Sequence, residues 1–359
     1  MQTIKRLNKN VHSILDDIDQ LYEYLSEHSD TYKNQLVAPT FDNSFSDLVD
    51  TFIDYGINDT NFTSENYEVN FTDVPYEPLE VPDSGNNLIL SFSGGRDSVA
   101  SALKYKEMGY NVYLYHLKHI NPAVSDEWVH AEKLAELLGL PIFVDTVKLS
   151  GHHVWMEHPM KNMMIANGAL SYGIREGIGT RLAFGNYTTS LLPYNSFDRC
   201  AGDCVDMWER YSKIIQRIIP DFEIYNTLEN LGETLDIITK RMDLLENALS
   251  CMCRHSLRPY RHSWVKSKYG IDLLENRCGS CFKCCVEYIY LADHDLIEFS
   301  EDYYKYCLNQ LFKVSRAEDL YLYSIENLWV HYLFYPIEQS KLYGTFDRVV
   351  VLRENIKWA

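Results

Sequence analysis

The feature that most constrains this chain is the run NNLILSFSGGRDSVAS, residues 86–101, in which an apolar segment leads into a helical pattern through a glycine pair. Residues 88–90 form a short apolar run typical of a fully buried strand. Val99 and Ala102 begin a segment whose apolar residues follow helical spacing. Because strand-to-helix units of this kind build parallel sheets covered by helices, the run predicts an α/β fold.

The glycine pair makes this junction suited to an anion. Because Gly94 and Gly95 lack Cβ atoms, the N–H groups of the first helical turn can approach phosphate oxygens closely. Ser93 and Ser98 add hydroxyl donors, and Asp97 is an acceptor that either shapes the loop or reaches a metal ion through water. The alternative is a glycine turn that only joins a strand to a helix. Neither the Walker loop nor the dinucleotide pattern fits.

Alternating strands and helices continue after this run and predict a doubly wound parallel sheet of five strands. Further strands are expected at 112–117, 142–147, 181–185 and 222–225, and helices at 127–138, 160–176 and 205–219. Ligands of such sheets bind beyond the carboxyl ends of the strands, where strand order reverses. Ser93, the stretch from His116 to His119 and the stretch from Gly185 to Thr189 lie at such ends. The two histidines are interpreted as ordinary strand-end residues.

Two terminal segments lie outside this pattern. Residues 1–85 combine an amphipathic helix over 11–25 with an acidic stretch, and form either an arm packed on the main domain or a partner-binding segment. Residues 293–359 are apolar-rich helices expected to pack on the core. Between them we expect an α/β domain over 86–230 and a helical segment with a cysteine motif over 231–292. The extensions are candidate surfaces for a homodimer or a partner protein.

The charge balance limits the partners of the chain. Its 359 residues carry a formal net charge of −18, which argues against broad contact with a nucleic-acid backbone. A local basic stretch is interpreted as a solvated loop or a phosphate-facing rim in preference to an RNA site; its members are Arg254, His255, Arg258, Arg261, His262, Lys266 and Lys268. The sequence shows neither a membrane-length apolar stretch nor a signal peptide, so we expect a cytoplasmic protein without membrane contact.

The late cysteines form a pattern typical of metal ligands. Three of them, in RCGSCFKCC, follow one another at three-residue spacing: Cys278, Cys281 and Cys284. Thiolates at this spacing converge on one tetrahedral metal, and Gly279 relieves the sharp turn. Cys251 is the best candidate for the fourth ligand and Cys253 its competitor. Four thiolates would make a structural zinc site, although an iron–sulfur cluster uses the same ligands and free buried cysteines are the alternative.

Residues 93–98 resemble SGGxDS, the pyrophosphate-binding loop of the PP-loop ATP pyrophosphatases. Together with the cysteine motif, the loop is similar to the 7-cyano-7-deazaguanine synthase family, which couples it to a late SC…CGxCxxC zinc motif. HPMKN looks like the VPxRN segment of that family, with Lys161 in the arginine position. The resemblance covers residues 86–292. The YPDCR motif of the family has only a loose echo in NSFDRC, residues 195–200, which leaves the substrate open.

The resemblance implies an adenine nucleotide alpha hydrolase-like (HUP) fold that uses ATP and Mg²⁺. The implied nucleotide-binding residues are Ser93, Gly94, Gly95, Arg96, Asp97 and Ser98 for the phosphates, Leu117 for adenine, and Gly185 and Asn186 for the ribose or α-phosphate. The implied structural Zn²⁺ ligands are Cys251, Cys278, Cys281 and Cys284. Asp97, Ser98 and Lys161 are the implied catalytic residues. Lys161 and Arg181 are cationic candidates for the α-phosphate or a substrate carboxylate, unless each pairs with a surface acid.

The implied reaction is that of an adenylating ligase. A carboxylate or amide oxygen of a small acid attacks the α-phosphate, pyrophosphate leaves, and ammonia then displaces AMP. One alternative is a sulfur-transferring or tRNA-modifying enzyme in which Cys200 or Cys285 carries sulfur, although the acidic charge argues against tRNA. The other is a non-catalytic nucleotide-binding subunit of a larger assembly. Asp97 and Ser98 argue against that reading, because a scaffold does not need them.

Overall fold

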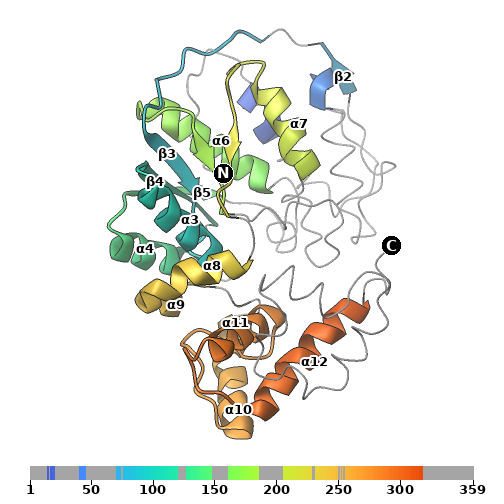
Figure 1. Cartoon of the computed structure of the whole chain (residues 1–359). Helices are drawn as coiled ribbons and strands as arrows, with labels where there is room; N and C mark the ends of the chain where they lie inside the picture. Colours follow the sequence, from blue (N-terminus) through green and yellow to red (C-terminus); the bar gives the residue numbers. More distant parts are fainter. Residues whose placement is uncertain are drawn as a thin grey trace, which may run out of the picture.

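The computed structural model describes the central part of the chain and short pieces of its first 75 residues. The described residues are 14–15, 17–20, 40–45, 70–73, 76–119, 127–147, 161–185, 205–228, 231–249, 251, 253 and 255–317. Figure 1 shows a sheet with its helices in the upper part of the view and a group of helices below it.

Five parallel strands form the central sheet, in the order β5-β4-β3-β6-β7. Their bounds are β3 Asn87–Ser91, β4 Asn111–His119, β5 Ile142–Val147, β6 Leu182–Ala183 and β7 Ile224–Tyr225. The first strand of the sheet lies in the middle, the next two on one side and the last two on the other. Strand order therefore reverses between β3 and β6, and the doubly wound sheet expected from the sequence is confirmed.

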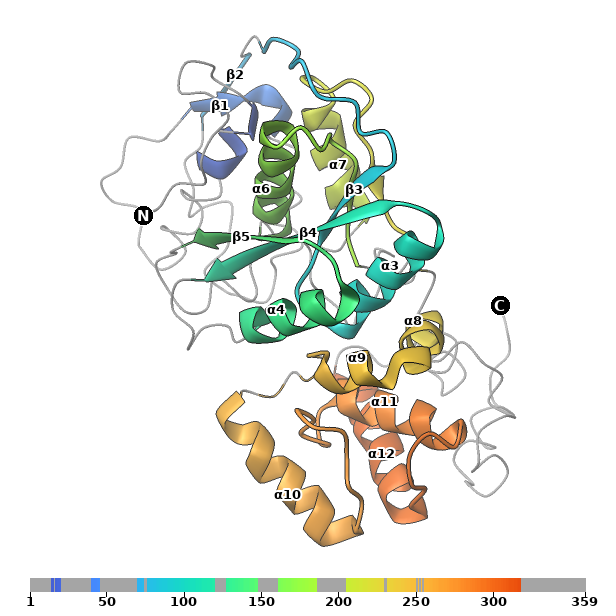
Figure 2. The ribbon, with the colours of Figure 1, turned by 90° about the vertical axis from the view of Figure 1, so that its left-hand side faces the viewer.

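Helices cover both faces of this sheet. They are α3 Arg96–Glu107 and α4 Glu127–Leu138 on one face, and α6 Lys161–Arg175 and α7 Val205–Ile215 on the other (Figure 2). The side chains of β3 alternate between the two cores: Leu88 and Leu90 pack with α3 and α4, and Ile89 packs with α6. Because both faces are covered, the three central residues of this strand, 88–90, are all apolar and fully buried. All four helices lie where the sequence predicts them.

A helical part continues the core on the α3 and α4 face. Its helices are α8 Leu231–Ile238, α9 Met242–Asn247, α10 Arg258–Tyr269, α11 Phe282–Asp293 and α12 Glu301–Ala317. One buried cluster joins α3 and α4 to α8, α9, α11 and α12. The interpretation of the basic stretch as a loop is wrong over α10, which starts with Pro259 in its first turn and ends at Gly270, φ +73°.

The described pieces of the amino-terminal segment pack on the sheet domain. Ile14, Leu15 and Ile18 are buried in the core of the α6 face, and the side-chain amide of Asn167 in α6 donates to the Leu15 carbonyl at 3.3 Å. These pieces are an ordered arm, one of the two interpretations that the sequence leaves open. Strands β1 Thr40–Asp42 and β2 Asn70–Thr72 pair in parallel, which the sequence did not predict.

At the other end, α12 packs on α11 through a set of fully buried side chains: Tyr303, Tyr304, Cys307 and Leu308. The expected packing on the core is seen for residues 303–308, and the expectations for the side chains of residues 311–317 and for residues 318–359 lie outside what the structure describes. Among the helices that the structure describes, none has the length and apolar character needed to span a membrane.

Candidate functional site

The candidate phosphate loop, residues 93–98, joins the carboxyl end of β3 to the start of α3. Gly94 has a φ of +76°, and a Cβ atom there would lie 2.8 Å from the backbone nitrogen of Ala131 in α4. The first hydrogen bond of α3 runs from the Val99 N–H to the Gly95 carbonyl (3.1 Å), so the amides of residues 96–98 precede the hydrogen bonds of the helix. These amides carry the positive end of the helix dipole, which suits an anion.

Gly185 lies directly against this loop, from the other side of the strand-order reversal. A Cβ atom at Gly185 would lie 2.6 Å from Cα and 2.7 Å from the backbone nitrogen of Ser98. Because β6 pairs with β3, the ends of the two strands meet at this point. The structure thus brings together the loop and Gly185, which are far apart in the sequence. Asn186 lies outside the described residues.

The side chains of the loop have different environments. Ser93 is exposed, and its hydroxyl oxygen accepts the Gly95 N–H at 3.2 Å. Ser98 is buried and donates its hydroxyl to the Gly95 carbonyl at 2.9 Å. The Asp97 carboxylate is 29% exposed and lies 3.7 Å from the Nε of Arg96. Asp97 is therefore an acidic group within reach of a solvated ion at the edge of the loop.

Arg96 points away from the loop and into the helical part. Its side chain is 4% exposed, and its guanidinium donates to the Glu287 carboxylate of α11 at 3.3 Å. Arg277 donates to the same carboxylate, and also to the carbonyl oxygens of Leu245 (2.9 Å) and Ala248 (2.7 Å). The guanidinium of Arg96 is thus committed to Glu287, which leaves its backbone amide for contact with a nucleotide.

Leu117 lies beside the loop on the neighbouring strand. Phe92 donates its N–H to the Tyr115 carbonyl at 2.8 Å, so the backbone of Leu117 continues β4 past the level at which β3 ends. His116 is buried with its Nδ1 2.8 Å from the Phe92 carbonyl oxygen, in agreement with its interpretation as an ordinary strand-end residue. Lys161 is the first residue of α6, and its side chain lies outside the described atoms.

Arg181 does not reach the loop, and its proposed contact with the α-phosphate is wrong. Its guanidinium donates to the carbonyl oxygens of Gly85 (2.5 Å) and Asn87 (3.4 Å) and lies over the rings of Tyr110 and Tyr225. Gly85 and Asn87 mark the start of β3, whereas the loop follows the end of this strand. Arg181 comes just before β6, and the amino ends of parallel strands lie at the opposite edge of the sheet from the ligand.

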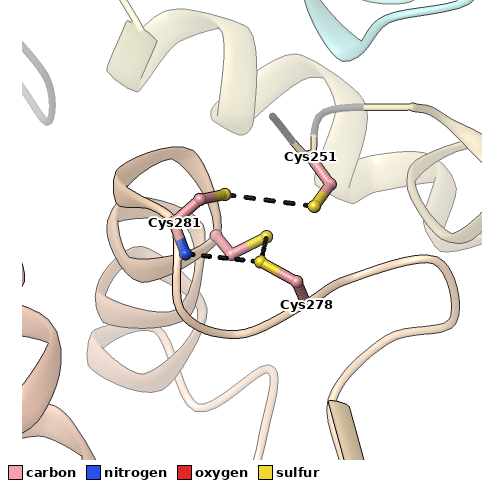
Figure 3. A group of neighbouring side chains, drawn as sticks. Cys251, Cys278 and Cys281 are labelled. Carbon is pink, nitrogen blue, oxygen red and sulfur yellow. Dashed lines mark hydrogen bonds between the residues drawn. The ribbon is translucent and has the colours of Figure 1, made fainter. Parts of the chain in front are cut away.

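The four predicted metal-binding thiols form a compact cluster. The Sγ atoms of Cys251, Cys278, Cys281 and Cys284 lie within 4.8 Å of one another. Figure 3 shows Cys251 facing Cys281 across the cluster, with 4.0 Å between their Sγ atoms, and Cys278 beside them. Zn–S bonds of about 2.3 Å place tetrahedral sulfurs roughly 3.8 Å apart, so the donor set fits zinc. Cys253 is not among the four, and its N–H donates to the Cys251 sulfur at 3.3 Å.

A sharp turn and two backbone N–H groups position the Cys278 sulfur in the cluster. Gly279 has a φ of +67°, as the sharp turn requires, and its carbonyl accepts the Tyr303 hydroxyl at 2.7 Å. The N–H groups of Ser280 and Cys281 each donate to the Cys278 sulfur at 3.3 Å. Hydrogen bonds from Cys251 and then from the other two thiols hold the pKa of Cys278 well below its usual range, whereas the hydrogen bonds within the cluster raise the pKa of Cys281 and Cys284. A thiolate is the form that binds metal.

Cys285 follows the cluster in sequence but belongs to the core. Its side chain has no exposed surface, and it lies among the apolar side chains of α11 and α12. A hydrogen bond with Cys307, together with burial, raises its pKa well above the ordinary value. A buried thiol of raised pKa is a poor nucleophile. Cys200, the other candidate for carrying sulfur, lies outside the described residues.

The loop and the cysteine cluster are directly connected. The Leu249 N–H donates to the Gly94 carbonyl at 2.9 Å, two residues before Cys251. In addition, Nδ1 of His130 in α4 lies 3.1 Å from the Asn247 carbonyl oxygen. Through these bonds and the Arg96–Glu287 pair, the segment between α9 and the cluster is fixed to the loop.

A short part of the chain is similar to a curated protein. Over 64 residues, 18% of this chain, the sequence is 41% identical to tRNA(Ile)-lysidine synthase of Thermus thermophilus, in two strains. The match spans only 13% of that relative. No family model matches the chain.

Among solved structures, NMN synthetase from Francisella tularensis aligns over 78% of this chain and 97% of its own, with a TM-score of 0.33 and 12% identity. A predicted subunit of tRNA methyltransferase from Methanocaldococcus jannaschii aligns over 43% and 74%, with a TM-score of 0.26 and 21% identity. Alignments this loose say nothing about chemistry. The SGGRDS turn and the order of the strands agree with the resemblance to the PP-loop ATP pyrophosphatases that the sequence indicates.

Proposed function

We propose that the chain binds ATP through residues 93–98 and uses it to adenylate an acid. One observation carries this proposal: the SGGRDS turn lies at the strand-order reversal, with Gly185 packed against the backbone of Ser98. That placement leaves the amides of residues 96–98 directed at the edge of the sheet where ligands of doubly wound folds bind. A glycine turn that only joined two elements would not need a second glycine to make room for it.

In the proposed first step, an oxygen of the substrate carboxylate or amide attacks the α-phosphorus of ATP. The bond between that phosphorus and the oxygen bridging to the β-phosphate breaks, and pyrophosphate leaves with the bonding electrons. In the second step, ammonia attacks the activated carbon, AMP leaves with its oxygen, and the ammonium loses a proton. The loop amides and the hydroxyl of Ser93 stabilise the charge on the departing pyrophosphate.

Magnesium would neutralise charge on the phosphates, with Asp97 as the acidic group of the loop placed to hold it through water. Lys161 begins α6 and remains our candidate for the cation that faces the α-phosphate or the substrate carboxylate.

Zinc would close the sulfur cluster. Four thiolates leave no open coordination position, so the metal there would hold the fold and take no part in the reaction. It would fix the segment that begins at Cys251, two residues after the Leu249 amide that binds the Gly94 carbonyl.

For the substrate, our first candidate is a carboxylated deazaguanine that is amidated with ammonia, as in 7-cyano-7-deazaguanine synthases. The support is the combination of the loop with Cys251 and the CGSCFKC run, whose four sulfurs meet as the zinc motif of that family would require.

The second candidate is an ATP-dependent tRNA-modifying ligase, in which the activated oxygen belongs to a base. The match to tRNA(Ile)-lysidine synthase favours it. Sulfur transfer through Cys285 is disfavoured, because that thiol has no exposed surface.

The experiment that tests the function follows α-labelled ATP with Mg²⁺, ammonium and carboxylated deazaguanine, and separates AMP from ADP. The proposal expects AMP and pyrophosphate in equal amounts, with formation dependent on the acid. Asp97→Asn should lower the rate by about 100-fold or more, and Asp83→Asn, an acid ahead of β3, should not change it. Formation of ADP and phosphate, or an unchanged rate in Asp97→Asn, would contradict the proposal.

A further inference from the structure

Helix α10 differs in charge from the rest of the molecule. The chain carries 51 Asp and Glu against 33 Lys and Arg, yet no carboxylate occurs between Glu246 and Asp272. The described helix, Arg258–Tyr269, contains four cationic side chains and no acidic one. The rest of this chain is acidic, with a net charge of −18, and repels polyanions. A positive surface on α10 would therefore direct a bound polyanion to this one helix.

One face of α10 packs on the domain and the opposite face is exposed to solvent. The inner face holds the helix on the domain: Val265 is fully buried, and Nδ1 of His262 lies 3.0 Å from the Arg277 carbonyl oxygen. The outer face presents Tyr260, which is 74% exposed, and Trp264, which is 36% exposed, one turn apart. Trp264 packs edge-to-face against Tyr269 and Tyr306, with ring centroids 5.8 and 5.7 Å apart, so its indole is held in place at this surface.

Cations are interleaved with these rings on the same face. Arg261 follows Tyr260 and is exposed, and the Lys268 ammonium lies 5.0 Å from the centroid of the Trp264 ring. Lys266 is more than half exposed but is partly neutralised by Asp272 at 2.7 Å. The outer face thus alternates aromatic surface with positive charge from Tyr260 to Lys268, along about two and a half turns of helix.

From this face we infer that α10 binds an unpaired segment of RNA. Guanidinium and ammonium groups neutralise phosphates, and aromatic rings one turn apart offer stacking surfaces for successive unpaired bases. A membrane-binding helix instead separates its apolar face from its cationic face, whereas here both share one face and the remaining apolar residues point into the domain. Unpaired bases are common in folded RNA and are absent from intact duplex DNA, so RNA is the occupant that fits both features.

The position of α10 connects this surface with the cysteine cluster. Arg261 donates to the Ser280 hydroxyl at 3.1 Å, and Ser280 lies between Cys278 and Cys281. Figures 1 and 2 place α10 at the end of the molecule away from the sheet. The inference rests on α10 alone and not on the proposed ATP chemistry, although an RNA partner would supply the substrate class of the second candidate function.

The test uses fluorescence anisotropy with the full chain and a labelled single-stranded RNA of about 12 nucleotides, a length that spans several stacking sites. We expect a dissociation constant in the micromolar range that rises steeply with salt. Tyr260→Ala with Trp264→Ala should weaken binding about tenfold or more. Arg261→Glu with Lys268→Glu should weaken it at least as much and flatten the salt dependence. The matched control, Lys133→Glu with Lys240→Glu, makes the same charge change on exposed residues of other segments and should stay within twofold.

Several outcomes would overturn the inference. They are no RNA binding at low salt, equal losses in the control and α10 variants, tighter binding to duplex DNA than to RNA, or tighter binding to phosphatidylserine vesicles. ATP affinity measured on the same α10 variants should be unchanged. A failure of RNA binding with intact ATP binding, or the reverse, therefore separates this inference from the proposed function.

Discussion

The phosphate loop and the cysteine cluster are built in opposite ways. The loop is one contiguous run whose geometry depends on backbone: a left-handed glycine, the first amides of α3, and the close approach of Gly185. The cluster depends on side chains from segments 27 residues apart, Cys251 and Cys278, which like charge would drive apart as thiolates unless a cation lay between them. The geometry of the loop is therefore set by the folded backbone, whereas four thiolates at the cluster would need the zinc that we propose to hold them together.

The two regions meet at a buried ion-pair network. Glu287 joins Arg96 of the loop to Arg277, which directly precedes Cys278, and all three side chains are nearly inaccessible to solvent. Buried charges are costly unless each is paired, so this network fixes one relative position of loop and cluster. We expect damage to the loop to weaken ligand binding far more than it lowers stability. Damage to the cluster should lower stability first and ligand binding second.

The largest effect is expected from Gly94→Ala. A Cβ atom there would lie 2.8 Å from the Ala131 nitrogen, so the loop or α4 must move, and ATP affinity should fall by about 100-fold or more. The control is Gly177→Ala, which has a similar φ of +69° and no atom within 4 Å. It should cost about 1–2 kcal/mol of stability and leave ATP affinity within twofold. Isothermal titration calorimetry measures the affinities. Equal losses in both variants would show that backbone strain alone accounts for the effect.

The next effect is expected from Cys278→Ser. Loss of one thiolate should release zinc and lower the melting temperature by about 10 °C, since a structural metal contributes several kcal/mol. Elemental analysis and calorimetry of the purified protein measure both quantities. Because the ligands must be deprotonated, zinc retention should also fall as pH is lowered. Cys285→Ala should keep a full equivalent of zinc, because that thiol lies in the core with Cys307. Metal-free wild-type protein of unchanged stability would contradict the assignment.

An intermediate effect is expected from Glu287→Gln. The variant keeps the shape of the side chain but leaves two arginines without their counter-charge, which should cost about 3 kcal/mol of stability. Because Arg96 belongs to the loop, ATP affinity should fall about tenfold while zinc is retained. The control is Glu246→Gln, an exposed acid at the end of α9. If denaturant unfolding shows a loss of stability but calorimetry shows wild-type ATP affinity, the network does not position the loop.

The smallest effect is expected from Arg181→Ala. Its guanidinium binds carbonyl oxygens at the start of β3 and lies over the ring of Tyr110, so its loss should cost about 1 kcal/mol of stability. ATP affinity should remain within twofold of the wild-type value. A tenfold weaker affinity for ATP in this variant would show that Arg181 does contribute to the nucleotide site.

The sequence predicted the sheet well because its signals are local. The hydrophobic pattern is readable within three short segments: the apolar run of residues 88–90, the helix Glu127–Leu138 and the strand Ile142–Val147. Tertiary contacts do not override it there. It also predicted three cysteines from their spacing, and the structure favours Cys251 over Cys253 because the Cys251 sulfur lies within 4.8 Å of all three others. Short strands such as β1 and β2, three residues each, have no period long enough to detect.

Other features depend on long-range contacts and could not be predicted. The direction of the Arg96 side chain is set by Glu287, 191 residues later, and nothing in the run SGGRDS indicates it. Arg181 was a candidate only because it is a cation near the expected strand 181–185, and its contacts with the Gly85 and Asn87 carbonyls depend on the pairing of that strand with β3. The contact of Gly185 with Ser98 follows from the pairing of β6 with β3, which local patterns do not specify.

The central claim is that residues 93–98 bind the triphosphate of ATP, and calorimetric titration of the full chain with ATP and Mg²⁺ tests it most directly. We predict one site per chain with a dissociation constant in the micromolar range, competition by inorganic pyrophosphate, and binding about 100-fold weaker or more in Gly94→Ala. Absence of heat with the wild-type protein, or wild-type binding in Gly94→Ala, would contradict the claim.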